Sequence, residues 1–280
     1  MSRPDEDARR AYWTASLDAA NALMDQVMTH RYEESGEPLG SIPDAMAAAG
    51  VEVQFSDSRL ADEFDRLFYI REGLLPHLID VAREMNDRGW ILKIEDGFRT
   101  QEMQTCLGRS PRTFDQVVRM CIWECHGELP SLELLFKRAR AMVAQNPVCG
   151  THTQGAAVDI SVYRRDDGSE LCRGKPYLEM SEITPMTSPF ITPEQHANRE
   201  QITTVMERHG FMHYPGEFWH YNQGDVLYQI LMKSDAPGRY GPVHWDRTTN
   251  TIVTYDDPCG RLTDEVKLES LLHEALARIG

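Results

Sequence analysis

Hydrophobic residues recur along the chain at spacings that distinguish helical from extended segments. Apolar positions three and four residues apart predict helices in several stretches, which are Asp5–His30, Leu74–Met85, Thr100–Ala144 and Thr263–Ile279. The third stretch is broken at Ser110-Pro111 and at Gly127–Pro130, so it predicts consecutive helices. A further helix is predicted from Thr192 to about His209, because Thr192, Pro193 and Gln195 form a capping-box start.

Other segments have the pattern of β-strands. Val51–Phe55 alternates apolar and polar residues, and Trp90–Ile94 is a short apolar run followed by Glu-Asp-Gly. In Val158–Tyr163 the even-numbered residues are apolar and point one way, while Asp159 and Ser161 point the other way. Helices in blocks, with few strands between them, predict an α+β fold rather than a series of βαβ units.

The charge and composition argue against two classes of partner. The chain has 280 residues and a formal net charge of −15, without a basic stripe, so neither nucleic acid nor a membrane surface is expected to bind. No apolar run approaches the ~20 residues that cross a bilayer. Residues 1–29 lack the features of a signal peptide, and the six cysteines are then expected to be reduced thiols. We therefore expect a cytoplasmic protein.

Two short segments hold the residues of a candidate zinc site, which in chain order are His152, Asp159, Glu217 and His220. Two imidazoles and one carboxylate leave an open position for water on zinc, and zinc lowers the pKa of that water to about 7. The remaining carboxylate, on Glu217, is the candidate general base. Gly155 permits a backbone turn that lets the His152 and Asp159 side chains converge.

The spacing of Glu217 and His220 poses a geometric question. Residues three apart on a regular strand point to opposite faces. The two side chains share a site only if the backbone bends or the pair lies at a strand end, which Pro215 and Gly216 make plausible. Helical spacing would also serve, but the Pro-Gly entry and the aromatic flanks disfavour a helix.

With Arg99 upstream, these segments resemble the zinc D,D-peptidases, in particular the D-alanyl-D-alanine dipeptidases of the vancomycin-resistance type. That family carries the motifs S-x-H-x-x-G-x-A-x-D and E-x-W-H. The first motif aligns with the segment Gly150-Thr151-His152-Thr153-Gln154-Gly155-Ala156-Ala157-Val158-Asp159. The two match at His152, Gly155, Ala157 and Asp159. The segment Glu217-Phe218-Trp219-His220 matches the second motif fully.

The resemblance implies that one zinc ion per chain is held by His152, Asp159 and His220. It implies that Glu217 is the catalytic base. The segment Asp96-Gly97-Phe98-Arg99 is similar to the one that bears the family's arginine, which implies that Arg99 stabilises the oxyanion of the tetrahedral intermediate. The implied fold is the D,D-peptidase/hedgehog-like zinc scaffold, with a small central antiparallel sheet and flanking helices.

The resemblance covers roughly Trp90 to Gly241 and departs from the family at two positions. Gly150 stands where a small hydroxyl residue is expected. Leu178 stands where the dipeptidases place an aspartate that holds the substrate's amino group, so Glu179 or Glu182 would supply that charge from a shifted position. Trp219 is expected either to pack beside the metal or to serve in packing alone. The candidate substrate-binding residues are Thr151, Glu179 and Trp219.

The leading functional hypothesis is zinc-dependent hydrolysis of D-Ala-D-Ala or a similar D-amino-acid dipeptide. The alternatives are a D,D-carboxypeptidase that acts on longer muropeptides and, less favoured because Glu217 is intact, a non-catalytic zinc-binding module. We expect residues 1–280 to form a single catalytic domain, with a helical N-terminal extension (1–45) and a C-terminal extension (242–280) that ends in a helix. The pattern leaves the oligomeric state open.

Overall fold

A computed structural model describes residues 3–280; residues 1 and 2 of the predicted N-terminal extension lie outside the described residues. The helices are α1 (Arg3–Thr29), α2 (Ile42–Ala49), α3 (Leu75–Asp87), α4 (Gln101–Arg109), α5 (Pro111–Glu124), α6 (Leu132–Met142), α7 (Pro193–Arg208), α8 (Val226–Leu231) and α9 (Glu265–Ile279). Short 3-10 helices are η1 (Glu72–Leu74), η2 (Pro147–Cys149) and η3 (Thr151–Gln154). The strands are β1 (Leu39–Ser41), β2 (Val53–Phe55), β3 (Tyr69–Arg71), β4 (Trp90–Asp96), β5 (Ala157–Arg164), β6 (Met212–His213), β7 (His220–Asn222), β8 (Val243–Asp246) and β9 (Thr251–Thr254).

Side-chain caps fix where the predicted helices begin. Ser110 accepts a hydrogen bond from the Thr113 amide at the start of α5, so the predicted break at Ser110-Pro111 separates α4 from α5. At the start of α7 the full capping box is present, with the Thr192 hydroxyl on the Gln195 amide and the Gln195 side chain on the Thr192 amide. These local signals were sufficient to predict both helix starts.

The central sheet has the strand order β2-β4-β5-β7-β6. The pairs β4–β5, β5–β7 and β6–β7 are antiparallel, whereas β2 and β4 are parallel. A parallel pair requires a crossover connection, and here the chain returns through β3 and α3 before it enters β4. The α+β prediction is confirmed, and the sheet is antiparallel except at this edge pair.

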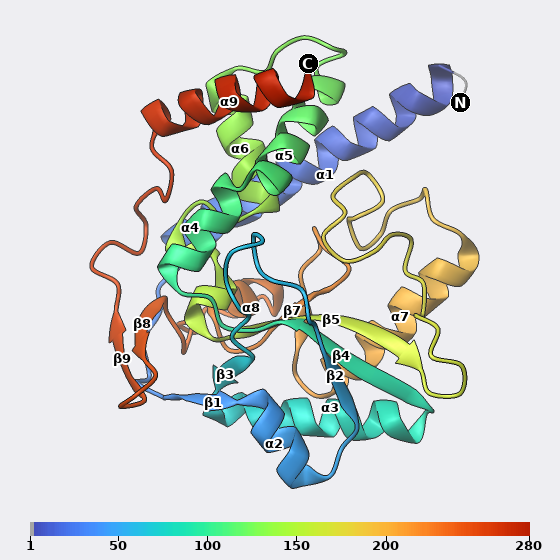
Figure 1. Cartoon of the computed structure of the whole chain (residues 1–280), viewed down its shortest axis with the longest axis vertical. Coiled ribbons are helices and arrows are strands. Elements are labelled where there is room, and N and C mark those ends of the chain that lie inside the picture. The colour runs from blue at the N-terminus through green and yellow to red at the C-terminus, as the bar shows by residue number, and fades with distance from the viewer. Residues whose placement is uncertain (1–2) are drawn as a thin grey trace.

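The sheet separates two groups of helices (Figure 1). On one face, α2, α3 and α7 cover the apolar side of β4 and β5, and the residues packed there include Leu78, Val81, Leu92, Ile94, Val158, Ile160, Val162, Val205 and Met206. We call this the lower core. On the other side lie α1, α4, α5, α6 and α9, which Figure 1 shows as a helical layer above the sheet. The candidate site residues on the strands face this second side.

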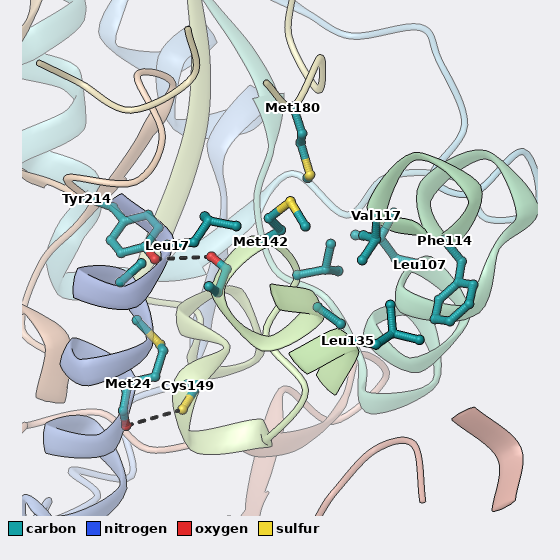
Figure 2. Close-up of a cluster of buried hydrophobic side chains, with 14 of the residues drawn as sticks. Leu17, Met24, Leu107, Phe114, Val117, Leu135, Met142, Cys149, Met180 and Tyr214 are labelled. Atoms are coloured by element: carbon teal, nitrogen blue, oxygen red, sulfur yellow. Dashed lines mark hydrogen bonds between the residues drawn. The ribbon is translucent and has the colours of Figure 1, made fainter. Parts of the chain in front are cut away.

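A second hydrophobic core fills the helical layer (Figure 2). Its members come from α1, α4, α5, α6, α8, α9 and η2, from the loop after β5 and from the segment before β7. Those labelled in Figure 2 are Leu17, Met24, Leu107, Phe114, Val117, Leu135, Met142, Cys149, Met180 and Tyr214. The Tyr214 hydroxyl donates to the Ala141 carbonyl at 3.2 Å, which ties the segment before β7 to the end of α6. Because α1 and α9 contribute buried residues to this same core, both terminal helices pack onto the segment between them.

Within residues 3–280, no helix is both long and apolar enough to span a membrane. Each of the six cysteines is a free thiol.

Candidate active site

Three neighbouring strands place polar residues in one row across the sheet. Asp159 on β5 is paired in register with Asp96 on β4 and with His220 on β7. Side chains at such directly opposed positions have Cβ atoms about 4.5–5.5 Å apart. Because the strand neighbours Val158 and Tyr221 pack into the lower core, alternation directs Asp159 and His220 to the opposite face, toward the helical layer.

A β-bulge in β4 brings Asp96 into this row. The register shifts between Ile94, which pairs with Ile160, and Asp96, which pairs with Asp159. Regular alternation would have kept Asp96 on the same face as Ile94, in the lower core. The bulge instead turns the Asp96 carboxylate toward Asp159 and Arg99.

His152 comes from a loop and not from the sheet. It lies in η3, which ends at Gly155 in the left-handed conformation with φ of 65°. A side chain at Gly155 would be strained there, and its Cβ would lie 2.4 Å from Leu39 Cδ2. The turn returns the chain into β5, so that the His152 and Asp159 side chains meet, as the sequence predicts.

The spacing of Glu217 and His220 is accommodated at a strand end. Residues 215–219 form turns, and β7 begins at His220. The turn is closed by hydrogen bonds from the Glu217 amide to the Tyr214 carbonyl and from the Tyr214 amide to the His220 carbonyl. Glu217 therefore lies before the strand, and the alternation of side chains along β7 does not set its direction. Of the arrangements that the sequence left open, the structure has the pair at a strand end.

The ligand atoms of His152, Asp159 and His220 lie within 4.8 Å of one another, and all three residues are buried. Asp159 Oδ1 is 3.2 Å from His152 Nε2 and 2.9 Å from His220 Nδ1. His152 Nδ1 lies 2.7 Å from the Gly97 carbonyl, which only accepts, so Nδ1 carries a proton and donates. In the neutral imidazole, Nε2 then presents its lone pair to a carboxylate oxygen, an arrangement that a cation between them would stabilise. The donor set fits zinc.

Burial and neighbouring charges shift the pKa values of Asp159 and His220. Burial alone would raise the pKa of Asp159, but the adjacent imidazoles of His152 and His220 hold it well below its usual range. Burial lowers the pKa of His220, although Asp159 opposes this shift. A charged carboxylate and a neutral imidazole are the forms that bind a metal ion.

The pKa of the buried carboxyl of Glu217 is shifted into the neutral range. Burial raises its pKa to about 8, and the negative charge of Asp159 adds to this shift, while Arg99 and the Trp219 side chain oppose it. A divalent cation at the neighbouring ligand atoms would lower this pKa through its positive charge. The carboxylate therefore sits where a metal ion would make it available as a base.

The outer oxygen of Asp159 is held by the predicted site residue Arg99 and by Tyr177, which sequence analysis did not assign to the site. The Tyr177 hydroxyl donates to Asp159 Oδ2 at 2.8 Å, and Arg99 Nη2 lies 3.3 Å from the same oxygen. Arg99 is itself fixed by Asp96 Oδ2 at 2.7 Å and by Gln104 Oε1 at 3.1 Å. Tyr177 ends the segment Gly174-Lys175-Pro176-Tyr177, directly before the departure at Leu178, so a signal that could have identified it was present in the sequence.

The sequence model of the Peptidase_M15 family, described as D-ala-D-ala dipeptidase, matches residues 77–234. The match covers more than half of the chain and includes all four residues of the proposed metal and base set. The chain belongs to this family of zinc D,D-peptidases.

Curated relatives agree over shorter segments. The chain is 32% identical over 78 residues to a D-alanyl-D-alanine dipeptidase of Enterococcus faecium, which covers 28% of this chain and 39% of the relative. It is 26% identical over 141 residues to one from Enterococcus faecalis (50% and 65%) and 26% identical over 136 residues to one from Streptomyces coelicolor (48% and 63%). The matches thus span less than two thirds of each relative.

Two solved structures were also matched. The LdcB LD-carboxypeptidase shows 18% identity and a TM-score of 0.37, with 74% of this chain and 76% of that chain covered. The vancomycin resistance D,D-pentapeptidase VanY, solved with Zn(II), shows 16% identity and a TM-score of 0.37, with 76% and 96% covered.

Most of the candidate site residues line one cavity of about 200 Å³. They are Arg99, Thr151, His152, Asp159, Glu217, Trp219 and His220. The Thr151 hydroxyl lies 2.8 Å from His220 Nε2, so it contacts a candidate ligand directly. The Trp219 ring packs edge-on against Tyr177 and Phe218, with centroids 5.6 and 4.7 Å away.

Glu179 is the candidate that the structure does not bring to the cavity. Its carboxylate forms an ion pair with Lys175 at 2.7 Å, and both side chains are exposed. Glu182, the other candidate for the shifted charge, pairs with Arg9 on α1. Leu178 lines the cavity at the position where the family pattern places an aspartate.

Proposed function

We propose that this protein is a zinc-dependent peptidase that hydrolyses the peptide bond of D-Ala-D-Ala or a similar D-amino-acid dipeptide. One observation carries the proposal: a zinc-type ligand set, a buried carboxylate and a buried arginine line a single cavity in a chain of the Peptidase_M15 family. Residues 1–280 would act as one catalytic domain, because α1 and α9 share the core of the helical layer.

The proposed ligands of one zinc ion are His152 through Nε2, Asp159 through Oδ1 and His220 through Nδ1. These three atoms face one another, and the opposite atom of each group is engaged by the protein at Gly97, Tyr177 and Thr151. Such outer contacts hold metal ligands in the required orientation and tautomer. When bound, zinc supplies an electrophile that activates water and polarises the scissile carbonyl.

The chain's own residues would move the proton and stabilise the developing charge. Glu217 takes the proton from the attacking water and later gives it to the leaving amine, which requires a carboxylate whose pKa lies near the working pH. Arg99 presents a permanent positive charge in the cavity wall, where the carbonyl oxygen becomes negative. Asp96 and Gln104 prevent Arg99 from turning away.

A second candidate is a zinc D,D-carboxypeptidase acting on longer muropeptides. A free dipeptide carries an ammonium group, and the family's dipeptidases hold it with an aspartate. Apart from Asp159 and Glu217, the carboxylate in the cavity wall is that of Asp62, which is exposed and lies 3.9 Å from Arg112. A substrate whose amino group is already in peptide linkage would not require that contact.

The test is D-alanine release by purified protein, with and without a chelator and with zinc restored. D-Ala-D-Ala is compared with a pentapeptide stem that ends in the same two residues. Chelator-sensitive release supports the peptidase, and the faster substrate decides between the two candidates. Glu217→Gln should abolish release while zinc content, measured by atomic absorption, stays near one per chain. If zinc-loaded protein cleaves neither peptide, the proposal is wrong.

A further inference from the structure

Two arginines of the cavity wall, the exposed Arg59 and the buried Arg66, lie outside the family-matched residues 77–234. Arg66 is in the loop between β2 and β3, and its side chain is 2% exposed. Its Nε donates to the Ser58 carbonyl at 2.9 Å, and its guanidinium lies over the Tyr177 ring, 5.7 Å from the centroid. The loop thus delivers a buried cation to the cavity from a part of the chain that the motifs do not cover.

Arg66 and Arg99 converge on a single carboxylate oxygen. Asp96 Oδ2 lies 2.9 Å from Arg66 Nη1 and 2.7 Å from Arg99 Nε. The contact between Arg66 Nη1 and Asp96 Oδ2 is short enough for an ion pair, but its atoms are not aligned for a hydrogen bond. Among the described residues, Nη1 is therefore a buried donor that has no hydrogen-bond acceptor. Such a donor favours a ligand that supplies the missing acceptor.

The other arginines of the cavity wall are engaged or exposed. Arg99 is held by Asp96, Asp159 and Gln104. Arg140 is bonded to residues of α1, and Arg59 and Arg112 are more than half exposed. Arg66 is therefore the buried arginine of the cavity with spare hydrogen-bonding capacity.

The local charge also favours an anion. Two arginines, Arg66 and Arg99, face two carboxylates, Asp96 and Asp159, so a zinc ion bound at the proposed ligands would leave this end of the cavity positive. A planar guanidinium matches the geometry of a carboxylate better than an ammonium does. The C-terminal carboxylate of a D,D-peptide lies one residue from the scissile bond.

From these contacts we infer that Arg66 is a specificity-determining residue that binds the free C-terminal carboxylate of the peptide substrate. The inference rests on the proposed peptidase function and adds a position from outside the family-matched segment. It applies to both candidate activities, because a dipeptide and a muropeptide stem share this terminal group. It also gives the loop that precedes β3 a role in substrate selection.

The experiment compares ligands that differ only at the C-terminus. The substrate pair is D-Ala-D-Ala and its C-terminal amide, or the corresponding pair of pentapeptide stems. The binding pair is a phosphinate analogue of D-Ala-D-Ala with a free carboxylate and the same analogue as its amide, with binding measured by calorimetry. Wild-type protein should prefer the carboxylate form of each pair. Arg66→Gln should reduce that preference by about 10- to 100-fold, chiefly through KM and Kd.

Controls separate binding from folding. Arg66→Lys keeps the charge and should retain part of the preference, whereas Arg83→Gln removes an exposed arginine that pairs with Asp80 outside the cavity wall and should retain all of it. Zinc content and thermal unfolding are measured for every variant. An unchanged preference in Arg66→Gln, or equal binding of both analogues by the wild type, overturns the Arg66 assignment alone. If neither analogue binds and no peptide is cleaved, the proposed function is overturned with it.

Discussion

The hydroxyl of Thr151 lies 2.8 Å from Nε2 of His220, and both residues are buried. His220 Nδ1 faces Asp159 on the other side of the ring. If Nδ1 is to bind a metal ion, the proton must reside on Nε2 and be donated to the Thr151 oxygen. In that tautomer Thr151 accepts a hydrogen bond from a proposed ligand, a role different from the substrate contact that the sequence indicated.

Thr151→Val should weaken zinc binding by about 10- to 100-fold, because valine preserves the shape of threonine and removes the acceptor for His220. Thr151→Ser keeps the hydroxyl and is the matched control. Competitive titration against a chromophoric chelator measures the affinity without reference to turnover. Equal zinc affinity in Thr151→Val and in the wild type would show that the hydroxyl does not set the tautomer.

Arg99→Ala should lower kcat by about 10²–10³, because a charge preorganised for the transition state is lost. Arg99 also holds the outer oxygen of Asp159, so zinc affinity should fall as well. Steady-state kinetics at saturating zinc separates the two effects. Gln104→Ala removes one support of Arg99 without removing the charge and should cost less. Unchanged kinetics in Arg99→Ala would remove Arg99 from the mechanism.

The sequence was sufficient to predict the residues that carry strong local chemistry. His152 and Asp159 come together as the first motif indicates, because Gly155 turns the chain between them. His220 joins them through the long-range pairing of β7 with β5, and the second motif had indicated it. The sequence did not reveal that the Asp96 side chain points into the site. The bulge that directs it there is set by the pairing of β4 with β5 and not by the β4 sequence. Arg66 was missed for a related reason: its position depends on how an irregular loop packs on Asp96 and Tyr177.

The fold shows the same division between local and distant causes. The long helices and the strands β4 and β5 follow from periodicity and caps, and β2 is the last part of the alternating segment Val51–Phe55. The three central helices break where proline and glycine occur. The strands β1, β3, β6 and β7 have only two or three residues each, too few to show a period. The segment Glu33–Pro43 has turn-rich composition, yet Ser41 caps α2 within it. Short strands such as these depend on tertiary pairing.

Arg199→Met should destabilise the protein by roughly 3–5 kcal/mol. The buried Arg199 side chain donates to the carbonyls of Arg173, Ile183, Pro185 and Met186, and its guanidinium lies 4.5 Å from the centre of the Phe218 ring. It thereby fastens the loop that carries Tyr177 to the turn that carries Glu217. Methionine fills similar space but leaves those carbonyls unsatisfied.

Denaturant unfolding of the metal-free protein measures this loss. Arg199→Lys can satisfy some of the carbonyls and should be intermediate in stability. Arg208→Met is the surface control, because Arg208 is exposed and pairs only with Glu84 among the described residues. A loss in Arg199→Met no larger than that in Arg208→Met would contradict the fastening role.

Asp225 should make stability depend on pH. It caps α8 and is fully buried, and its Oδ1 accepts from Asn222 Nδ2 and from the Tyr228 amide, both at 2.7 Å. Among the described residues, Oδ2 has no hydrogen-bond partner. Burial raises the pKa of Asp225 to about 6, although those hydrogen bonds oppose the shift. In the unfolded chain the pKa is near its ordinary value of 3.8.

Between these two values the folded protein retains a proton that the unfolded chain has released. The contribution of Asp225 to the free energy of unfolding must then decrease as pH rises from about 4 to 6, and it is lost above pH 6. Asp225→Asn keeps an oxygen acceptor for the Tyr228 amide and cannot titrate. Urea unfolding is measured at several pH values. From about pH 4 to 6 the free energy of unfolding of the variant should rise relative to that of the wild type, by on the order of 2 kcal/mol. A constant difference between the two proteins would mean that Asp225 is charged in the folded state throughout, with its pKa little changed by burial.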